Sequence, residues 1–538
     1  MTGGFWRKSG VKNGVRIYLT THGPRFWATV ARTPGVRSVV NRWIINSSIY
    51  TMATRPPALS AKSDYTSWDS LRDRTFSARH LERDADLPAS AQPIDDTAVK
   101  ALFGRPDGAG KLSTKSSLLF PLFAQWFVDG FLRTDPENAL KNQSTHDIDL
   151  SQLYGQTVDV TNQLRTGSGG RLKSQRINGQ EFPPYYFNDN GQVKLEFVDL
   201  PIAYPGNDRK SQAVKDIPAE IRQKLFALGI PRGNIHYGFA MMSTLFLREH
   251  NRLAGLIAAA HHDWDDERIF QTARNTLTVL LIKVVIEDYI NHITPIKFPL
   301  FVEAGIGVKE KWYRQNWMSI EFNLLYRWHS LVPSEVKVGG TPRMFASLQW
   351  DTRPVTDHGL AVLFAEASEQ RCGTISLQNT DKFLLPTEKT SIEIGRKAQL
   401  APYNKYRQRC GFPRLRSIAE LTSDRSVQEA LEDCYGGIDE VELFVGLFAE
   451  DVRDGSTLPT LMSVMVGVDA FSQALTNPLL APGIFKQDTF SGPGWDAIKS
   501  TKTLSDIVNR NTGGETPNPK VSLAYTPELS SSGSSLLD

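Results

Sequence analysis

The amino-acid sequence predicts a mainly α-helical protein with long irregular connections and little β-structure. In residues 240–260, Met242, Phe246, Leu253 and Ile257 recur at spacings of four and seven, which places one apolar stripe along a helix. Alternation of apolar and polar residues, the pattern of a half-buried strand, is scarce. With 538 residues and 40% hydrophobic content, the chain can bury a large core. We therefore expect one large helical domain.

The N-terminal part divides into two predicted segments. Residues 1–23 form an extension, and residues 24–54 mix apolar side chains such as Trp43 with basic ones such as Arg37 and Arg42. This mixture is typical of short amphipathic helices. Two interpretations remain open: the helices lie on a membrane surface, or they pack on their own domain.

The rest of the chain is predicted to be one domain, residues 55–510, followed by a poorly ordered tail, residues 511–538, that is rich in small polar residues. Prolines and small residues predict a linker or extended arm at 55–64, and residues 83–112 should be mostly loop. We expect helices over residues 116–132, 240–260, 267–293 and 313–330.

Composition excludes several classes of function. The chain has 61 basic and 58 acidic residues and no Lys/Arg-rich run, so we expect no nucleic-acid partner. Its three cysteines, Cys372, Cys410 and Cys434, are widely spaced and odd in number, which indicates free thiols in a reducing, cytoplasmic compartment. The N-terminus lacks the apolar run of a secretory signal, and Lys283 interrupts the most apolar helix, so we expect no transmembrane helix.

One segment places a phenol and an imidazole close together in apolar surroundings. Tyr326 and His329 would share a helical face, since residues i and i+3 are neighbours on a helix. A buried histidine alone is more often a hydrogen-bonded core residue than a ligand. Other motifs in the chain strengthen a functional interpretation of Tyr326 and His329. Four of them occur in this order: FWATVARTPGVR at 26–37, FAQWFVDGFL at 123–132, THDIDLSQLYG at 145–155 and LREHNR at 247–252.

With these motifs the sequence resembles the animal-type haem peroxidase superfamily, and within it most closely the cyclooxygenases, from about Phe26 to about residue 505. The resemblance implies a helical haem peroxidase fold. It also implies that His329 binds the iron of haem b and that Tyr326 is the tyrosine oxidised to a radical. Val128 and Ile235 match the positions of covalent haem links in mammalian peroxidases, so we expect noncovalent haem.

The peroxide side departs from the family pattern. Gln125 matches the family's glutamine, but Asp129 stands where the histidine that deprotonates peroxide is expected. A carboxylate can move that proton if its pKa is suitable. Arg232, sixteen residues before Arg248, matches an arginine of the myeloperoxidase branch. It would polarise the outer peroxide oxygen, or else bind a haem propionate or an acid on the surface.

A loop of alternating oxygen donors resembles the family's calcium loop. Thr145, Asp149 and Ser151 match its ligands, and Asp147 would donate its backbone carbonyl. The loop is equally well explained as a helix N-cap or a solvated turn. Gly130 stands where a further carboxylate ligand is expected, so the aspartate before it would have to turn toward a cation.

The substrate-carboxylate anchors of the cyclooxygenases have no counterpart here. Their arginine falls near Ser48 or Ile49 and their tyrosine at Ile296, and neither position can pair with a carboxylate. The serine modified by aspirin falls at Ala470 or Ser472. A fatty acid would therefore have its head group held differently, or would enter tail first.

These observations predict a haem-dependent fatty-acid dioxygenase, cytoplasmic and peripherally attached to a membrane. It would add O₂ to an unsaturated fatty acid to give a hydroperoxide, with weak peroxidase activity because Asp129 replaces the histidine. One alternative is a true peroxidase with small donors, in which Tyr326 is structural. Another is a haem-binding protein that has lost turnover.

Overall fold

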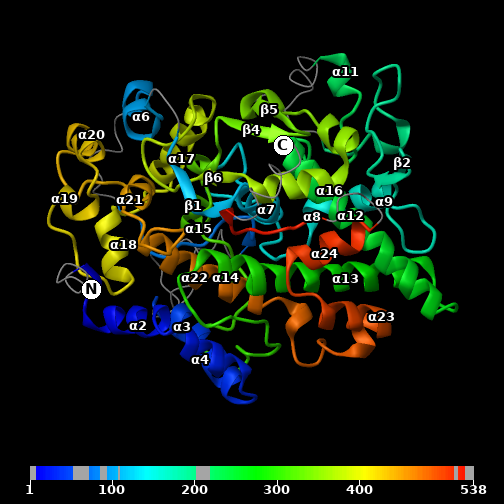
Figure 1. Cartoon of the computed structure of the whole chain (residues 1–538), viewed down its shortest axis with the longest axis horizontal. Helices are drawn as coiled ribbons and strands as arrows, with labels where there is room; N and C mark the ends of the chain where they lie inside the picture. Colours follow the sequence, from blue (N-terminus) through cyan, green and yellow to red (C-terminus); the bar gives the residue numbers. More distant parts are fainter. Residues whose placement is uncertain are drawn as a thin grey trace, which may run out of the picture.

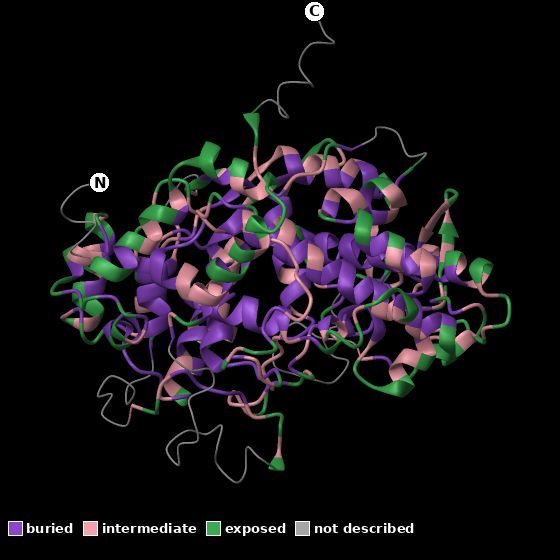
Figure 2. Ribbon diagram, turned by 90° about the horizontal axis from the view of Figure 1, so that it is seen from below, coloured by how far each residue is buried: buried purple, intermediate pink, exposed green. Residues whose placement is uncertain are grey.

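The computed structural model describes residues 8–52, 72–84, 94–106, 110–201, 218–513 and 519–527. Helices dominate, and the long helices α12 and α13 run side by side through the molecule (Figure 1). Strands form three two-stranded antiparallel sheets, β1 with β6, β2 with β3 and β4 with β5. Buried residues make a continuous core across the length of the molecule (Figure 2). The prediction of a mainly helical fold with little β-structure is confirmed.

The helices run, in chain order, over α2 Val11–Thr21, α3 Pro24–Arg32, α4 Val36–Ile49, α6 Asp96–Phe103, α7 Leu119–Val128, α8 Ser151–Tyr154, α9 Val158–Leu164, η3 Leu195–Phe197, α11 Ala219–Arg222, α12 Tyr237–Ala260, α13 Asp266–Val284, η4 Val285–Ile290, α14 Asn291–Ile293, α15 Ile320–Leu325, η5 His329–Leu331, η6 Phe345–Leu348, α16 Arg353–Glu369, η7 Lys382–Leu384, α17 Leu385–Lys397, α18 Tyr403–Arg409, α19 Ile418–Leu421, α20 Arg425–Tyr435, α21 Leu443–Ala449, α22 Thr460–Leu475, η8 Pro478–Leu480, α23 Gln487–Ser500 and α24 Leu504–Asn511. The strands are β1 Leu112–Ser117, β2 Gln175–Ile177, β3 Gln180–Phe182, β4 Glu335–Val338, β5 Thr341–Met344 and β6 Arg371–Gly373.

The pair α12 and α13 is the scaffold on which the other helices pack. His250 fixes α12, since its Nδ1 lies 2.8 Å from the Tyr154 hydroxyl and its Nε2 lies 2.9 Å from the Gly170 carbonyl. The α13 helix continues through the π-helical turn η4 into α14. By length and hydropathy, Asp266–Ile293 is the one helix of the described residues that resembles a membrane span, but 78% of its most apolar stretch is buried inside the fold.

The α7 helix is fixed to α12 by its tryptophan. Trp126 stacks on Phe246 with ring centroids 4.3 Å apart, and its Nε1 donates to the Ser243 hydroxyl at 3.0 Å. Gln125 and Asp129 lie one turn apart on this helix, and both stay partly exposed while the helix is otherwise largely buried. Trp126 therefore sets the direction in which these two polar side chains point.

The chain does not form the predicted helix over residues 313–330. Helix α15 ends at Leu325, and Tyr326 (φ −106°, ψ 21°) and Trp328 (φ −87°, ψ 52°) leave helical geometry. The rings of Tyr326 and Trp328 stack with centroids 4.8 Å apart, and this contact replaces the continuing helical turn. Tyr326 and His329 therefore do not share a helical face, and that prediction was wrong.

A helix lies where the sequence predicted mostly loop. Helix α6 occupies part of residues 83–112, because the Asp95 carboxylate accepts a hydrogen bond from the Ala98 amide at 2.6 Å and caps it. Val99, Leu102 and Phe103 then bury one face. The sequence analysis missed this short amphipathic helix because the residues around it are rich in Pro and Gly.

Residues 519–527 also depart from prediction, because they are ordered against strand β1. Leu523 is 3% exposed, and its carbonyl accepts a hydrogen bond from the Ser117 amide at 2.9 Å. One apolar side chain thus anchors a stretch that the sequence predicted to be poorly ordered. The predicted linker at 55–64 and residues 528–538 lie outside the described residues.

The N-terminal helices α2, α3 and α4 lie together at one side of the molecule (Figure 1). One face packs on the domain, since Trp27, Ile44 and Ile45 are buried. The Asn41 amide donates to the Phe301 carbonyl at 3.0 Å. Packing on the chain's own domain is therefore confirmed for this face. The opposite face remains exposed.

Leu523→Ala should lower the free energy of unfolding by about 2–5 kcal/mol, the range for truncating a buried leucine. Chemical denaturation of the two proteins measures the difference. Lys520→Ala, an exposed position in the same stretch, is the control and should change it by less than about 0.5 kcal/mol. Equal stabilities of the leucine variant and wild type would show that the tail is not anchored.

Candidate active site

Tyr326 is 9% exposed and faces Tyr289 of the π-helical turn. Neither hydroxyl makes a well-aligned hydrogen bond to a described residue, yet the two are close enough to shift each other's pKa. Burial raises the pKa of Tyr326, the Tyr289 hydroxyl lowers it, and the Asp469 carboxylate raises it again. The net effect is a higher pKa, so the phenol keeps its O–H at neutral pH.

Aromatic rings surround the two tyrosines. Phe322 meets Tyr326 edge-on with centroids 4.9 Å apart, and Trp328 stacks on its other side. Phe120 stacks on both Trp328 and Tyr289, at 5.7 and 5.6 Å. The Tyr326 ring thus lies in a cage of aromatic rings.

Asp469 is a fully buried carboxylate that acts on Tyr326 from α22. Its oxygen lies 2.9 Å from Nε2 of His80 and accepts a hydrogen bond from the Ser319 hydroxyl at 3.2 Å. These contacts hold the carboxylate in place without a bond to Tyr326. Sequence reasoning did not identify Asp469, since its partners are far away in the chain.

The two candidate positions for the aspirin-type serine lie on the same helix. Ser472 is buried, and its hydroxyl donates to the Val468 carbonyl at 2.8 Å. Ala470 is 8% exposed. The Ser472 hydroxyl is therefore hydrogen-bonded to the backbone of its own helix.

His329 has the arrangement of a metal-ligating histidine. Its Nδ1 lies 3.1 Å from Oε2 of the fully buried Glu388, whose other oxygen accepts a hydrogen bond from the Thr380 hydroxyl at 2.8 Å. Nε2 makes no hydrogen bond to a described residue, and the side chain is 20% exposed. A histidine whose second nitrogen faces a carboxylate is typical of metal sites. The predicted role of His329 as iron ligand fits this geometry, and Glu388 is a partner that the sequence did not reveal.

Strand β6 fixes the backbone that carries His329. Gly373 packs so closely on the turn that a Cβ there would collide with the Ser330 carbonyl. Only glycine permits this approach. The close contact holds η5 against the core beside α17, which supplies Glu388.

On the opposite side, Gln125 is held by a histidine that the sequence analysis missed. Nδ1 of His236 accepts from the Phe239 amide at 3.2 Å, so Nε2 carries the proton and donates to Oε1 of Gln125 at 2.9 Å. Burial, assisted by Arg232, lowers the pKa of His236 to about 3. The imidazole is therefore neutral, and it leaves the amide N–H groups of Gln125 available to a ligand.

Asp129 lies among three arginines. Burial raises the pKa of its carboxyl group, while Arg232, Arg133 and Arg327 oppose the rise. Its Oδ2 has no hydrogen-bond partner among the described residues. Arg327 also interacts electrostatically with Glu388, so one guanidinium influences both the Asp129 side and the His329 side. The structure thus brings Gln125, Asp129 and Arg232 together, and their role on the peroxide side stays a prediction.

The predicted calcium loop is closed by its own hydrogen bonds. The Thr145 hydroxyl donates to Asp149 at 2.7 Å, and the other Asp149 oxygen accepts from the Ser151 amide at 2.8 Å. The Ser151 hydroxyl donates to the Gly130 carbonyl at 2.7 Å. The Asp147 carboxyl group instead interacts with Asn316, and burial raises its pKa to about 6.

A positively charged side chain already lies beside this loop. The Arg133 guanidinium lies 3.4 Å from the Ser151 hydroxyl, and a Cβ on Gly130 would collide with Oε1 of Gln152. Within the described ranges, no group of three or more His, Cys, Asp or Glu residues could hold a metal ion. Calcium at this loop therefore stays a prediction.

An apolar pocket opens between the N-terminal helices and α22. Ser48 lines it and donates to the Ile44 carbonyl at 2.8 Å, Ile296 lines the opposite wall, and Ile49 is buried in the core. None of these side chains can bind a carboxylate, as the sequence indicated. Ile290, the residue after Tyr289 in the chain, also lines the pocket.

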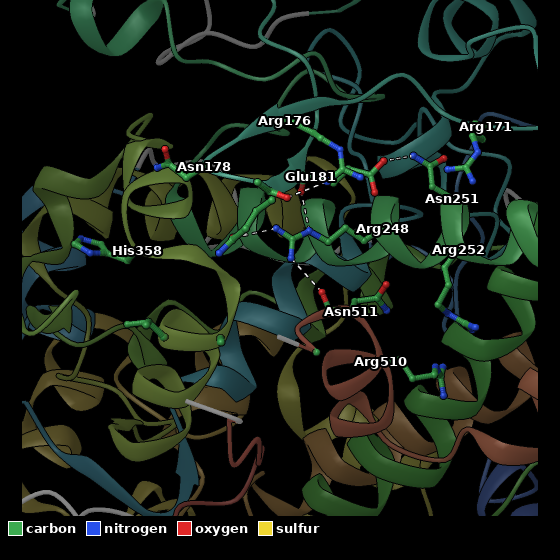
Figure 3. A pocket seen from close by; sticks show the side chains of 15 residues that line it. Arg171, Arg176, Asn178, Glu181, Arg248, Asn251, Arg252, His358, Arg510 and Asn511 are labelled. Atoms are coloured by element: carbon green, nitrogen blue, oxygen red, sulfur yellow. Dashed lines mark hydrogen bonds between the residues drawn. The ribbon is translucent and has the colours of Figure 1, made fainter. Parts of the chain in front are cut away.

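A second, arginine-rich cavity lies on the far side of α12 (Figure 3). Arg252 and Arg510 both pair with Glu249, at 2.8 and 2.9 Å. Arg248 donates to the carbonyls of Glu181 and Asn511, at 2.7 and 3.1 Å. These arginines already have partners, and no predicted site residue lines the cavity. We assign it no part in the chemistry.

Comparison with known proteins identifies the family. The model of the animal haem peroxidase family matches residues 129–522. Prostaglandin G/H synthase 2 of Equus caballus is 30% identical over 543 residues, covering 97% of this chain and 85% of the relative. Prostaglandin G/H synthase 1 of Canis lupus familiaris is also 30% identical, covering 92% of this chain and 80% of the relative.

Two solved structures share the fold. The fatty acid alpha-dioxygenase of Oryza sativa has a TM-score of 0.66 at 17% identity and covers 94% of each chain. Peroxidase A of Dictyostelium discoideum has a TM-score of 0.62 at 18% identity, covering 82% of this chain and 91% of its own. The chain therefore belongs to the animal haem peroxidase family, in its cyclooxygenase-like branch, and is an oxidoreductase of that superfamily.

Proposed function

We propose that this protein is a haem-dependent fatty-acid dioxygenase that forms a lipid hydroperoxide. The observation that carries the proposal is the position of Tyr326, a caged phenol whose hydroxyl has no well-aligned partner among the described residues, close to Tyr289 and three residues from His329. The names of relatives and structural neighbours, prostaglandin synthases and fatty acid dioxygenases, support a lipid substrate.

Haem b fits the residues present. His329 would hold the iron through Nε2, with Glu388 3.1 Å behind Nδ1 helping to orient the imidazole. Val128 and Ile235 carry no carboxylate that could form an ester link, so the haem would be noncovalent. When bound, haem supplies the oxidising power that it takes from a peroxide.

The proposed reaction at Tyr326 proceeds through two radicals. The phenol loses one electron and one proton and becomes a phenoxyl radical. The radical takes a hydrogen atom from a C–H bond beside a double bond of the fatty acid, which restores the phenol. O₂ adds to the carbon radical, and the resulting peroxyl radical regains a hydrogen atom from Tyr326. The net change converts one C–H bond and one O₂ into one hydroperoxide.

The surroundings of Tyr326 suit this role. Burial keeps the phenol protonated, so that it has a hydrogen atom to lose, and the aromatic cage keeps water from the radical. Tyr289 offers a nearby hydroxyl and can modulate the energy of the radical through it.

The peroxide side would turn over slowly. Gln125, with its amide held by His236, and Arg232 can orient a peroxide, but proton transfer falls to Asp129 instead of a histidine. We propose that the hydroperoxide product therefore leaves largely unreduced. The alternative, a fast peroxidase with small donors, lacks its usual base.

The exposed face of the N-terminal helices supports attachment to a membrane surface. Large apolar side chains stand out on α2, α3 and α4: Val11, Val15, Tyr18, Leu19, Phe26, Val36, Val39, Trp43 and Tyr50. The exposed Arg25, Arg32 and Arg37 lie among them. Apolar residues interleaved with arginines suit the interface of an anionic membrane. Residues of α2 and α4 also line the apolar pocket, so a lipid could enter it from the membrane.

Tyr326→Phe should abolish lipid oxygenation and keep the haem spectrum, because it deletes only the O–H. Oxygen uptake with oleate, linoleate and arachidonate, with mass spectrometry of the products, measures the effect. Tyr154→Phe, which removes a buried hydroxyl far from Tyr326, is the matched control and should keep its activity. Hydroperoxide formed by the Tyr326 variant would rule out the radical assignment.

His236→Leu should slow the reaction with peroxide by about 10- to 100-fold, because Gln125 loses the donor that orients its amide. His236→Gln keeps an N–H donor and should restore part of the rate. Stopped-flow spectroscopy of the haem-loaded proteins gives both rates. Because burial lowers the pKa of His236 to about 3, its protonation should cause no step in the wild-type rate near pH 6.5. An unchanged rate in the leucine variant would refute the positioning role.

A further inference from the structure

One arginine from the N-terminal extension projects into the apolar pocket. Arg16 lies on the inner face of α2, and its Nη1 donates to the Ser47 carbonyl at 2.7 Å and to the Thr51 hydroxyl. Helix α2 is itself fixed, because the Asn13 amide donates to the carbonyls of Cys410 and Gly411, both at 3.0 Å. The guanidinium is therefore held at a defined place between α2 and the end of α4.

The pocket that receives Arg16 is built like a site for an apolar chain. The space inside it that a water molecule can occupy is about 110 Å³, less than the usual ~300–1,000 Å³ of small-molecule sites, so a long chain requires the pocket to widen. Aliphatic and aromatic side chains form most of its inner wall: Ile290, Ile293, Pro295, Ile296, Val464, Val466 and Phe471. No described residue that lines it is an aspartate or glutamate.

Among the described residues, Arg16 has no anionic partner. Its hydrogen bonds go to a carbonyl and a hydroxyl, both neutral, and use only one of its three nitrogens. No carboxylate of the described residues lies within ion-pair distance of it. Burial lowers the pKa of Arg16, which is the mark of a charge that its surroundings do not neutralise. Its remaining N–H groups form the planar fork that pairs best with a carboxylate.

The other arginine of the pocket is engaged elsewhere. Arg453 donates to the Ser9 hydroxyl at 3.1 Å, and its charge interacts favourably with Glu450. Arg16 is therefore the better candidate for an incoming anion.

We propose that Arg16 binds the carboxylate of a long-chain fatty acid at the mouth of the pocket, with the hydrocarbon tail directed inward toward Tyr326. This inference rests on the proposed function and names how its substrate is held. It supplies from α2 the anchor that is absent at Ser48, Ile49 and Ile296.

This orientation determines where oxygen is added. Ile290 and Phe471 line the pocket, and they are next in the chain to Tyr289 and two residues from Asp469, the two residues that act on Tyr326. Tyr326 itself is not among the residues that line the pocket with Arg16. The hydrogen taken by Tyr326 therefore comes from the interior of the chain, and the hydroperoxide forms there and not on the carbon next to the carboxylate.

Arg16→Gln tests the charge while keeping an amide N–H for the Ser47 carbonyl. In the haem-loaded enzyme the variant should raise KM for linoleate by about 10- to 100-fold, the loss expected for hydrogen bonds to a charged group, with little change in kcat. Methyl linoleate should show the same KM in both proteins. Arg42→Gln is the matched control, because Arg42 lies on α4 outside the pocket and pairs with Glu303. It should leave both values unchanged.

Binding measured without turnover separates the two proposals. Displacement of a fluorescent fatty acid by palmitate should be weaker for Arg16→Gln than for wild type, and methyl palmitate should not distinguish them, whether or not the enzyme oxygenates lipids. Equal KM for linoleate, or equal palmitate affinity, in variant and wild type would overturn the role of Arg16 and leave the dioxygenase proposal standing. A wild-type product oxygenated next to the carboxylate would also overturn it. Absence of oxygenation together with Arg16-dependent palmitate binding would contradict only the dioxygenase.

Discussion

The site depends on the end of helix α15 at Leu325. Because the chain leaves helical geometry there, Tyr326 turns toward Tyr289 and Asp469, while His329 turns toward Glu388. A continued helix would have pointed both side chains to one face. The break is stabilised by the stacking of Tyr326 on Trp328 and by the close approach of β6. The packing around the break therefore sets the directions of the Tyr326 and His329 side chains.

Buried charge is the second constraint on this site. Asp469 is held by His80, and Glu388 is held by Thr380 and faces His329. Buried carboxylates are costly unless they are hydrogen-bonded or paired. Each of these two lies beside a residue of the proposed chemistry and influences it from a fixed position. In the proposed reaction, Asp469 and Glu388 therefore act on Tyr326 and His329 without contacting the substrate.

Much of this could be predicted from the sequence, because it is encoded locally. The apolar stripe of α12 and the motifs around Gln125 and His329 predicted the fold. Among the predicted site residues, the structure brings Gln125, Asp129 and Arg232 together. What the sequence could not show are contacts between distant segments, such as His236 with Gln125 or Glu388 with His329. Local signals also failed at residues 313–330, where ring stacking overrides the helical pattern, and at Leu523, whose anchoring depends on a strand about 400 residues earlier.

The central claim is that an oxidising equivalent resides on Tyr326. Electron paramagnetic resonance of the haem-loaded protein, frozen within milliseconds of mixing with a lipid hydroperoxide, tests it most directly. The account predicts a tyrosyl signal that narrows when the protein contains ring-deuterated tyrosine, persists in Tyr289→Phe and is lost in Tyr326→Phe. A signal of undiminished intensity in Tyr326→Phe, or no tyrosyl signal in the wild type, would contradict it.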